Sequence, residues 1–197
     1  LEVIKKLSHK PILRANDIRV WPATQAFDFN LCPGEIVGIT GLDGQGQSEF
    51  VRAISGVIPL LDGKINVIYN GRANSVSDLK SARENSISYI SGDRKKEGLF
   101  PNLSIFENMC LSVYEQFTWG GFLKLINKYK LNSIFAHETN KLATKMGDEG
   151  DLITSLSGGN QQKILIGRSF AERPSILVLN DPARGIDVGA KLDLYRN

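Results

Sequence analysis

The sequence predicts an α/β fold with a mainly parallel sheet and an inserted helical subdomain. Two apolar runs, 36–40 and 175–182, have the composition of buried strands, and each leads into glycine or polar residues. Ligands in open α/β sheets bind at the carboxyl ends of such strands. The middle third of the chain has helical patterning, whereas both flanks alternate β-type runs with helices. We therefore expect a ligand-binding α/β core that a helical subdomain interrupts.

The composition limits the classes of protein to which the chain can belong. Its 197 residues, 42% hydrophobic and 23% charged, are typical of a globular protein with one good core. The net charge of +3 is dispersed, so we expect no nucleic-acid partner. No apolar stretch approaches the roughly 20 residues that cross a bilayer. Cys32 and Cys110 are isolated, which predicts reduced thiols, and two histidines argue against a His/Cys metal site.

Local signals predict the remaining elements. Capping residues indicate helices that begin near Ser77, Ser104 and Ser157. The polar, glycine-rich stretch 92–100 is expected to be a surface loop. Residues 1–11 have mixed charge and no period, and are typical of a linker from an upstream domain. The expected strands are short ones within 12–31, two at 64–69 and 87–90, and a fully buried one at 175–182, and the other expected helices are 49–55, 122–146 and 160–172. The α/β core is expected to consist of residues 12–91 and 164–197, and the helical subdomain of about 92–163.

The stretch 41–48 has the pattern of a phosphate-binding loop. Glycines in such a loop let successive N–H groups point at an anion, and the following helix adds the positive end of its dipole. The pattern is met except that Gln47 stands where a lysine is expected. An ordinary glycine-rich turn is the alternative. Trp21 is either an adenine-stacking residue or part of the core. The candidate nucleotide-binding residues here are Gly41, Gly44, Gly46, Gln47, Ser48, Glu49 and Trp21.

A second constellation lies in the last quarter of the chain. Ser157 can cap a helix whose first turn, opened by Gly158 and Gly159, offers N–H groups and a hydroxyl to an anion. Asn180 and Asp181 end the apolar strand at 175–182, where Mg²⁺ and an attacking water would be handled. A capped helix without a ligand would explain the first feature alone. The two features together favour a nucleotide site.

These motifs, in this order, resemble those of the ATP-binding cassette (ABC) ATPases, which have a P-loop NTPase core. The resemblance covers residues 12–197, and it implies an antiparallel β subdomain beside the core. Finer features are Asn160-Gln161-Gln162-Lys163 after the signature, Asp93-Arg94-Lys95 followed by Glu97-Gly98-Leu99, and the stretch 184–191. They are similar to the second cassette of tandem ATPases that drive bacterial import of ribose, galactose or xylose. Nucleoside importers use similar cassettes.

The resemblance implies a role for each motif. The loop 41–48 would wrap the phosphates of ATP, and Ser48 would reach Mg²⁺, with Asn180 as a second metal ligand. The signature residues 157–159 would bind the γ-phosphate of ATP held on the opposite cassette. Asp187 would communicate across the cassette dimer, and the segment 93–100 would lie near the transmembrane partner.

The resemblance also implies partners and a location. They are a second cassette, expected on the same polypeptide, transmembrane permease subunits and, indirectly, a periplasmic or extracellular substrate-binding protein. The location would be the cytoplasmic face of the membrane. Because the chain ends at Asn197, before the strand and switch loop that cassettes normally carry, we expect a C-terminally truncated cassette.

Four positions depart from the family pattern. Gln47 brings no charge to the phosphates. Asn180 replaces an aspartate that supports Mg²⁺, and Asp181 is one methylene shorter than the glutamate that normally positions water. Gly92 stands where a glutamine or acidic residue is expected. The sequence therefore predicts that the nucleotide site built by this chain's own loop is degenerate, retaining ATP but hydrolysing it slowly or not at all. The signature that the chain would offer to a partner cassette is intact.

Other readings remain open at this stage. A non-hydrolysing structural or regulatory cassette would explain the four departures. A soluble cassette of a DNA-repair or translation factor would predict coiled-coil arms or a basic groove, and the sequence contains neither.

Overall fold

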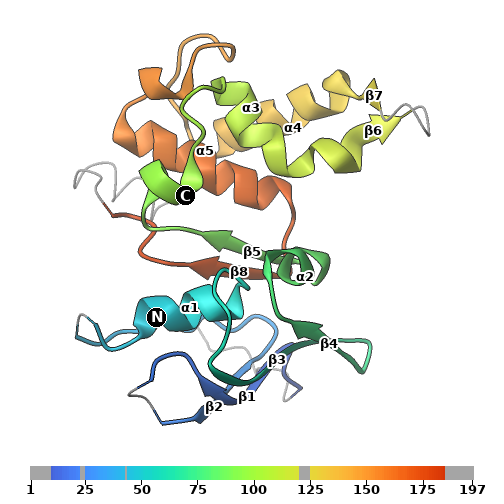
Figure 1. The fold of residues 1–197 in the computed structure, drawn as a ribbon. Coiled ribbons are helices and arrows are strands. Elements are labelled where there is room, and N and C mark those ends of the chain that lie inside the picture. Colours follow the sequence, from blue (N-terminus) through green and yellow to red (C-terminus); the bar gives the residue numbers. More distant parts are fainter. Residues whose placement is uncertain (1–9, 23–24, 43, 120–124, 185–197) are drawn as a thin grey trace, which may run out of the picture. The chain divides into compact units, whose positions relative to one another are not determined.

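The computed structural model describes residues 10–22, 25–42, 44–119 and 125–184. The chain divides into two compact units, Leu1–Ile87 and Ser88–Asn197 (Figure 1). Within the described ranges, no helix is long and apolar enough to cross a membrane. Most of the expected linker and all of the stretch from 185 onward lie outside the described residues.

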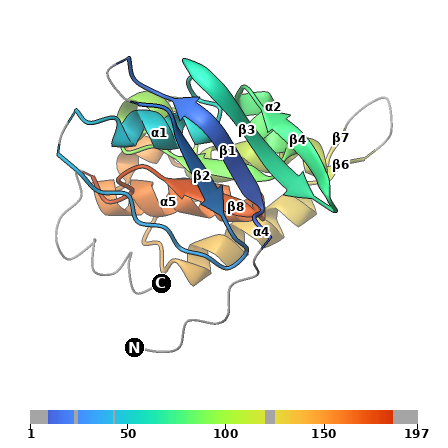
Figure 2. The ribbon, with the colours of Figure 1, turned by 90° about the horizontal axis from the view of Figure 1, so that it is seen from below.

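A four-stranded antiparallel sheet forms most of the first unit. Its strands are β1 (Leu13–Arg19), β2 (Phe27–Leu31), β3 (Asp62–Tyr69) and β4 (Arg72–Val76), in the order β2-β1-β3-β4 (Figure 2). Leu13 and Ala15 are buried while the intervening Arg14 is exposed, as the two-residue repeat of a strand requires. Asn70 and Gly71 have φ of 50° and 77°, which suits the two-residue turn between β3 and β4. The strands expected within 12–31 and at 64–69 and the antiparallel β subdomain are confirmed.

Two helices belong to the first unit. Helix α1 (Gln47–Ile54) places Phe50 against the rings of Phe27 and Phe29, at 5.4 and 5.1 Å between centroids. Gly56, at φ +69°, follows its last turn, as its expected role at the helix end requires. Helix α2 (Leu79–Glu84) differs from the prediction, because its cap is Asp78 and not Ser77. The Asp78 carboxylate accepts a hydrogen bond from the Ser81 N–H at 2.7 Å, and this bond lowers the pKa of that carboxyl.

The predicted buried strand at 36–40 is wrong. The run has no regular secondary structure, and Ile36, Val37 and Ile39 are 98%, 41% and 42% exposed. A strand exists through ladder hydrogen bonds to a neighbour, and none of the described sheets includes this segment. Apolar composition suggested a buried strand, but composition does not supply the pairing partner that a strand needs, and these side chains are exposed.

The second unit is mainly helical. Its core gathers apolar side chains from three helices, with Ile105 and Met109 from α3 (Ile105–Cys110), Leu131 and Phe135 from α4 (Lys128–Lys141) and Ile164 from α5 (Gly158–Ala171). Ser104 and Glu107 form the capping box that the sequence predicts for α3. The other elements are β5 (Ile87–Ile90) paired with β8 (Ile176–Leu179), the hairpin β6 (Thr118–Trp119) and β7 (Leu125–Ile126), the π-helical turn η1 (Arg94–Gly98), and the 3-10 helices η2 (Leu111–Phe117) and η4 (Ile153–Ser155).

Three expectations for this unit need correction. The helix expected over 122–146 is shorter, because Leu125–Ile126 form β7 and Ala143, at φ 45°, follows the end of α4. The strand at 175–182 is not fully buried, since Leu179 is 46% exposed. The stretch 92–100 is not simply a surface loop, because η1 buries Arg94 and Gly98.

Both cysteines are free thiols, as predicted. Cys110 is fully buried in the core of the second unit. Burial raises the pKa of its thiol to about 12, so Cys110 stays protonated at neutral pH. This thiol therefore serves as a small apolar core group.

Candidate functional site

The first group of predicted site residues surrounds the start of α1. Gly44 and Gly46 have φ of 80° and 94°, a region that glycine enters without strain. Gly46 is the N-cap of α1, and no side chain makes a capping bond there. Ser48 is exposed and Glu49 half-buried in the first turn. The local backbone thus has the glycine conformations and the helix start that a phosphate-binding loop needs.

Gln47 is engaged within its own loop. Its Nε2 donates a hydrogen bond to the Leu42 carbonyl at 2.9 Å, and Gln45 Oε1 accepts one from the Leu42 N–H at 3.2 Å. A Cβ atom on Gly41 would collide with the Gln47 amide group. The glycine at 41 therefore makes room for Gln47 to fold over the loop, a contact that the sequence did not indicate.

Trp21 lies beside this loop and is not a core residue. Trp21 is 43% exposed, which excludes the alternative that it belongs to the core. Its Cβ is 3.9 Å from the position that a Cβ of Gly46 would take. The adenine-stacking role of Trp21 stays a prediction.

The signature turn lies in the second unit and is held by side-chain hydrogen bonds. Ser157 is the N-cap of α5, and its Oγ accepts from the Asn160 N–H at 3.4 Å and from Asn160 Nδ2 at 3.1 Å. Gln161 Nε2 donates to the carbonyls of Ile153 and Leu156, at 3.3 and 3.2 Å. The helix therefore starts at 158, two residues before the prediction, with its cap as expected.

The serine cap allows a direct test of this turn. We expect Ser157→Ala to lower the free energy of unfolding by about 1 kcal/mol, because an N–H at the start of α5 loses its acceptor. Ser133→Ala, an exposed change inside α4, is the matched control and should leave stability equal or slightly higher. Urea unfolding of both variants measures the difference. Equal stability of the two would contradict the capping role.

Asn180, Asp181 and Gly92 are neighbours at one end of the β5–β8 pair. Asn180 N donates to the Ile90 carbonyl at 3.0 Å, and Asn180 Nδ2 donates to Tyr89 Oη at 3.0 Å. A Cβ on Gly92 would lie 2.6 Å from the Asn180 carbonyl oxygen. The two backbones thus meet where the family pattern has a long side chain.

Asp181 has an unusual backbone conformation for a residue with a side chain. Its φ is +46°, and Asp and Asn enter this left-handed region more readily than other non-glycine residues. Its carbonyl accepts from the Arg184 N–H at 3.1 Å, which closes a turn after β8. The backbone itself therefore favours Asp over Glu at this position.

The predicted site residues fall into separate parts of the molecule. The loop and Trp21 belong to the first unit, whereas the signature turn, Gly92, Asn180 and Asp181 belong to the second. Asp187 lies outside the described residues. Among the residues described, no group of three or more His, Cys, Asp or Glu side chains could hold a metal ion.

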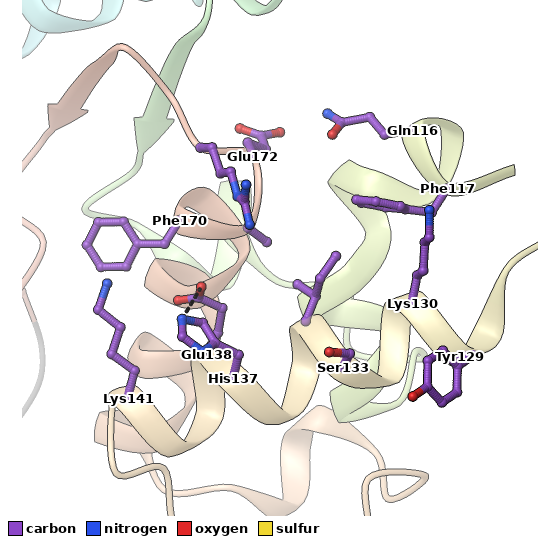
Figure 3. Close-up of a pocket in the computed structure, with 13 residues that line it drawn as sticks. Gln116, Phe117, Tyr129, Lys130, Ser133, His137, Glu138, Lys141, Phe170 and Glu172 are labelled. Carbon is purple, nitrogen blue, oxygen red and sulfur yellow. Dashed lines mark ion pairs between the residues drawn. The ribbon is translucent and has the colours of Figure 1, made fainter.

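A hollow that the sequence did not indicate lies on the second unit, with a volume of about 760 Å³ (Figure 3). Glu138, 7% exposed, is one of the lining residues, and its Oε2 has no hydrogen-bond partner. His137 Nε2 is 3.8 Å from the other oxygen, and Lys141 Nζ lies 4.6 Å from the ring centre of Phe170. None of the predicted site residues lines this hollow.

Solved structures define the class of protein to which this fold belongs. The ATP-binding cassette MJ1267 superposes with a TM-score of 0.74 at 16% identity, covering 95% of this chain and 75% of that one. The cassette MJ0796, in a dimer bound to ADP and Pi, gives 0.73 at 17% identity, covering 93% and 80%. The fold is therefore that of the ATP-binding cassettes.

The sequence comparisons identify the family. The model of the ABC transporter family matches residues 24–184, and the chain belongs to that family. A ribose/galactose/methyl galactoside import ATP-binding protein of Pseudomonas fluorescens is 37% identical over 96% of this chain and 37% of its own length. The ribose import ATP-binding protein RbsA of Clostridium tetani is 36% identical over 93% of this chain and 36% of its own length. The chain thus spans little more than a third of these relatives.

Proposed function

We propose that this chain is a nucleotide-binding cassette of an ABC importer that couples ATP binding and hydrolysis to uptake of a monosaccharide. Its own site would hold ATP with weak hydrolysis or none, and its signature turn, 157–159, would complete a competent site on a second cassette. Similarity to the ribose and galactose import proteins over nearly the whole chain supports this function. Transmembrane permease subunits and a substrate-binding protein are the further partners, at the cytoplasmic face of the membrane.

The observation that carries the proposal is the contrast between an intact signature turn and an altered nucleotide site on this chain. The signature turn has its family residues, a serine cap and two hydrogen bonds from Gln161 to the segment before it. The own site is altered at Gln47, Gly92, Asn180 and Asp181, and each alteration has local support, as a hydrogen bond, a close backbone approach or a left-handed backbone. Alterations with such local support are consistent with a site that holds nucleotide without efficient catalysis.

The residues present fit ATP in part. Positive φ at Gly44 and Gly46 and the start of α1 suit phosphate binding through backbone N–H groups. The Gln47 amide must leave the Leu42 carbonyl before it can donate to a phosphate. Mg²⁺, which neutralises phosphate charge when bound, would be held by the hydroxyl of Ser48 and the side-chain oxygen Oδ1 of Asn180. The side-chain nitrogen of Asn180 already donates to Tyr89 Oη.

Single-turnover hydrolysis, measured in the assembled transporter and assigned to each cassette, tests the proposal. We expect the site built by residues 41–48 to be much slower than the site that uses this chain's signature. The triple variant Gln47→Lys, Asn180→Asp and Asp181→Glu should raise the slow rate by about ten- to a hundredfold, because one charge-assisted contact contributes about 1.5–3 kcal/mol. Equal rates at the two wild-type sites would overturn the degenerate-site proposal.

Two alternatives predict different results. A structural or regulatory cassette, which the four alterations favour, would show no saturable Mg²⁺-dependent binding of a labelled ATP analogue at millimolar concentration. A nucleoside importer would bind and hydrolyse ATP in the same way but would take up labelled nucleoside and not ribose, galactose or xylose.

A further inference from the structure

One buried guanidinium, that of Arg94, connects three segments that are far apart in the sequence. Arg94 is 9% exposed and begins η1. Its Nε donates to Gln161 Oε1 at 3.4 Å, across 67 positions of the chain. Its Nη1 donates to the Arg184 carbonyl at 3.0 Å, across 90 positions. The same side chain thus reaches the first turn of α5 and the turn that follows β8.

The Gln161 end of this connection leads directly to the signature. While Gln161 Oε1 accepts from Arg94, its Nε2 donates to the carbonyls of Ile153 and Leu156, which precede the signature serine. Gln161 therefore fixes the chain on both sides of residues 157–159. A shift of the Arg94 guanidinium would be passed through one amide group to the signature backbone.

The hydrogen bond from Arg94 to the Arg184 carbonyl reaches the turn after β8, where Asp181 departs from the family pattern. The Arg184 N–H donates to the Asp181 carbonyl at 3.1 Å, so the Arg184 carbonyl belongs to the turn that Asp181 begins. That turn leads into the residues from 185 onward, among them Asp187. Arg94 thus holds the start of the segment to which the family resemblance assigns communication between cassettes.

The other end of η1 is attached to α5 independently. The Gly98 carbonyl accepts from Arg168 Nη1 at 2.7 Å, and a Cβ on Gly98 would lie 2.9 Å from Leu165 Cδ2. The π-helical turn is therefore fixed to α5 through Arg168 and Leu165, whether or not Arg94 is present. Arg94 is the η1 side chain whose hydrogen bonds reach both the signature turn and the turn at 181–184.

We propose that Arg94 is a positioning residue that keeps the signature turn and the 181–184 turn in register with η1, so that a displacement of η1 reaches both turns together. The inference rests on the proposed function insofar as these turns serve a cassette dimer. A planar fork with donors on different nitrogen atoms suits two acceptors in different directions, whereas a lysine ammonium does not.

The variants are Arg94→Met, Arg94→Lys and the control Lys95→Ala, an exposed change in the same turn. Amide hydrogen exchange of the intact protein should be about tenfold faster at 157–161 and at 181–184 in both Arg94 variants, and unchanged at α4. Lys95→Ala should change neither turn. This arm requires no ATPase activity, so it decides on the positioning role even if the proposed function fails.

The second arm uses the assembled transporter. If the wild type hydrolyses ATP, Arg94→Lys should lower kcat about tenfold while KM for ATP stays within about twofold, because a misplaced signature acts on the transition state. Faster exchange confined to 93–98, or full rescue by lysine, would each overturn the proposal. A wild type without ATPase activity would contradict the proposed function and leave the exchange result to decide on Arg94.

Discussion

Replacing Arg168 by methionine should lower the free energy of unfolding by about 3 kcal/mol or more. Arg168, on α5, donates from Nε to the Asn108 carbonyl at 2.5 Å, from Nη1 to the Gly98 carbonyl at 2.7 Å and from Nη2 to Asn108 Oδ1 at 3.2 Å. Methionine has a similar length but no donor, so the two largely buried carbonyls lose their partner, at about 1–3 kcal/mol each. Burial lowers the pKa of Arg168 to about 10, which still leaves it charged at neutral pH.

Thermal and urea unfolding measure this effect, and two further variants interpret it. Lys130→Met removes an exposed cation from the same unit and should change stability by less than about 0.5 kcal/mol. Arg168→Lys retains the charge without the fork and should recover less than half of the loss. A loss below about 1 kcal/mol for Arg168→Met would mean that η1 and α3 do not depend on this guanidinium.

The second large effect is expected for Gly92→Gln, the change that would restore the family pattern at that position. The Cβ alone would lie 2.6 Å from the Asn180 carbonyl oxygen and 3.4 Å from that of Asp181. Because backbone atoms cannot rotate away as a side chain does, β5 and β8 would have to separate. We expect a loss of about 2–3 kcal/mol and no gain in hydrolysis, in spite of the more usual residue.

Two controls accompany this variant. Gly92→Ala should produce most of the loss of stability, since the collision begins at the Cβ. Gly38→Ala is the matched change at a glycine with no atom within 4 Å of its Cβ position, and its effect should be within about 0.5 kcal/mol. If Gly92→Gln were as stable as the wild type and hydrolysed ATP faster, the close approach of the two strand ends would not be what excludes a glutamine here.

Local rules accounted for much of what the sequence could predict. Asn70-Gly71 specified a tight turn, and Ser104 with Glu107 specified a helix start, because each side chain acts on backbone atoms a few positions away. The signature cap at Ser157 was predictable for the same reason. The cap at Asp78 in place of Ser77 is an error of one residue, and the start of α5 at 158 in place of 160 is an error of two.

Features that depend on distant partners could not be predicted in this way. The apolar run at 36–40 has a strand composition but no partner in the described sheets. The stretch 92–100 is polar, yet Arg94 is buried because its acceptors come from positions 161 and 184. Gly92 was recognised as a missing side chain, whereas its role in the packing of Asn180 depends on an approach of two strand ends that no local pattern records.

The hydrogen bond from Gln47 to Leu42 has a consequence for the kinetics of nucleotide binding. A lysine at this position would be attracted to phosphates at long range and would make a new contact on arrival. Gln47 must instead exchange the Leu42 carbonyl for a phosphate oxygen, so the enthalpy change on binding would be small. Association should then depend little on ionic strength through this residue, and nucleotide residence in this loop would be governed by how readily the Leu42 contact forms again.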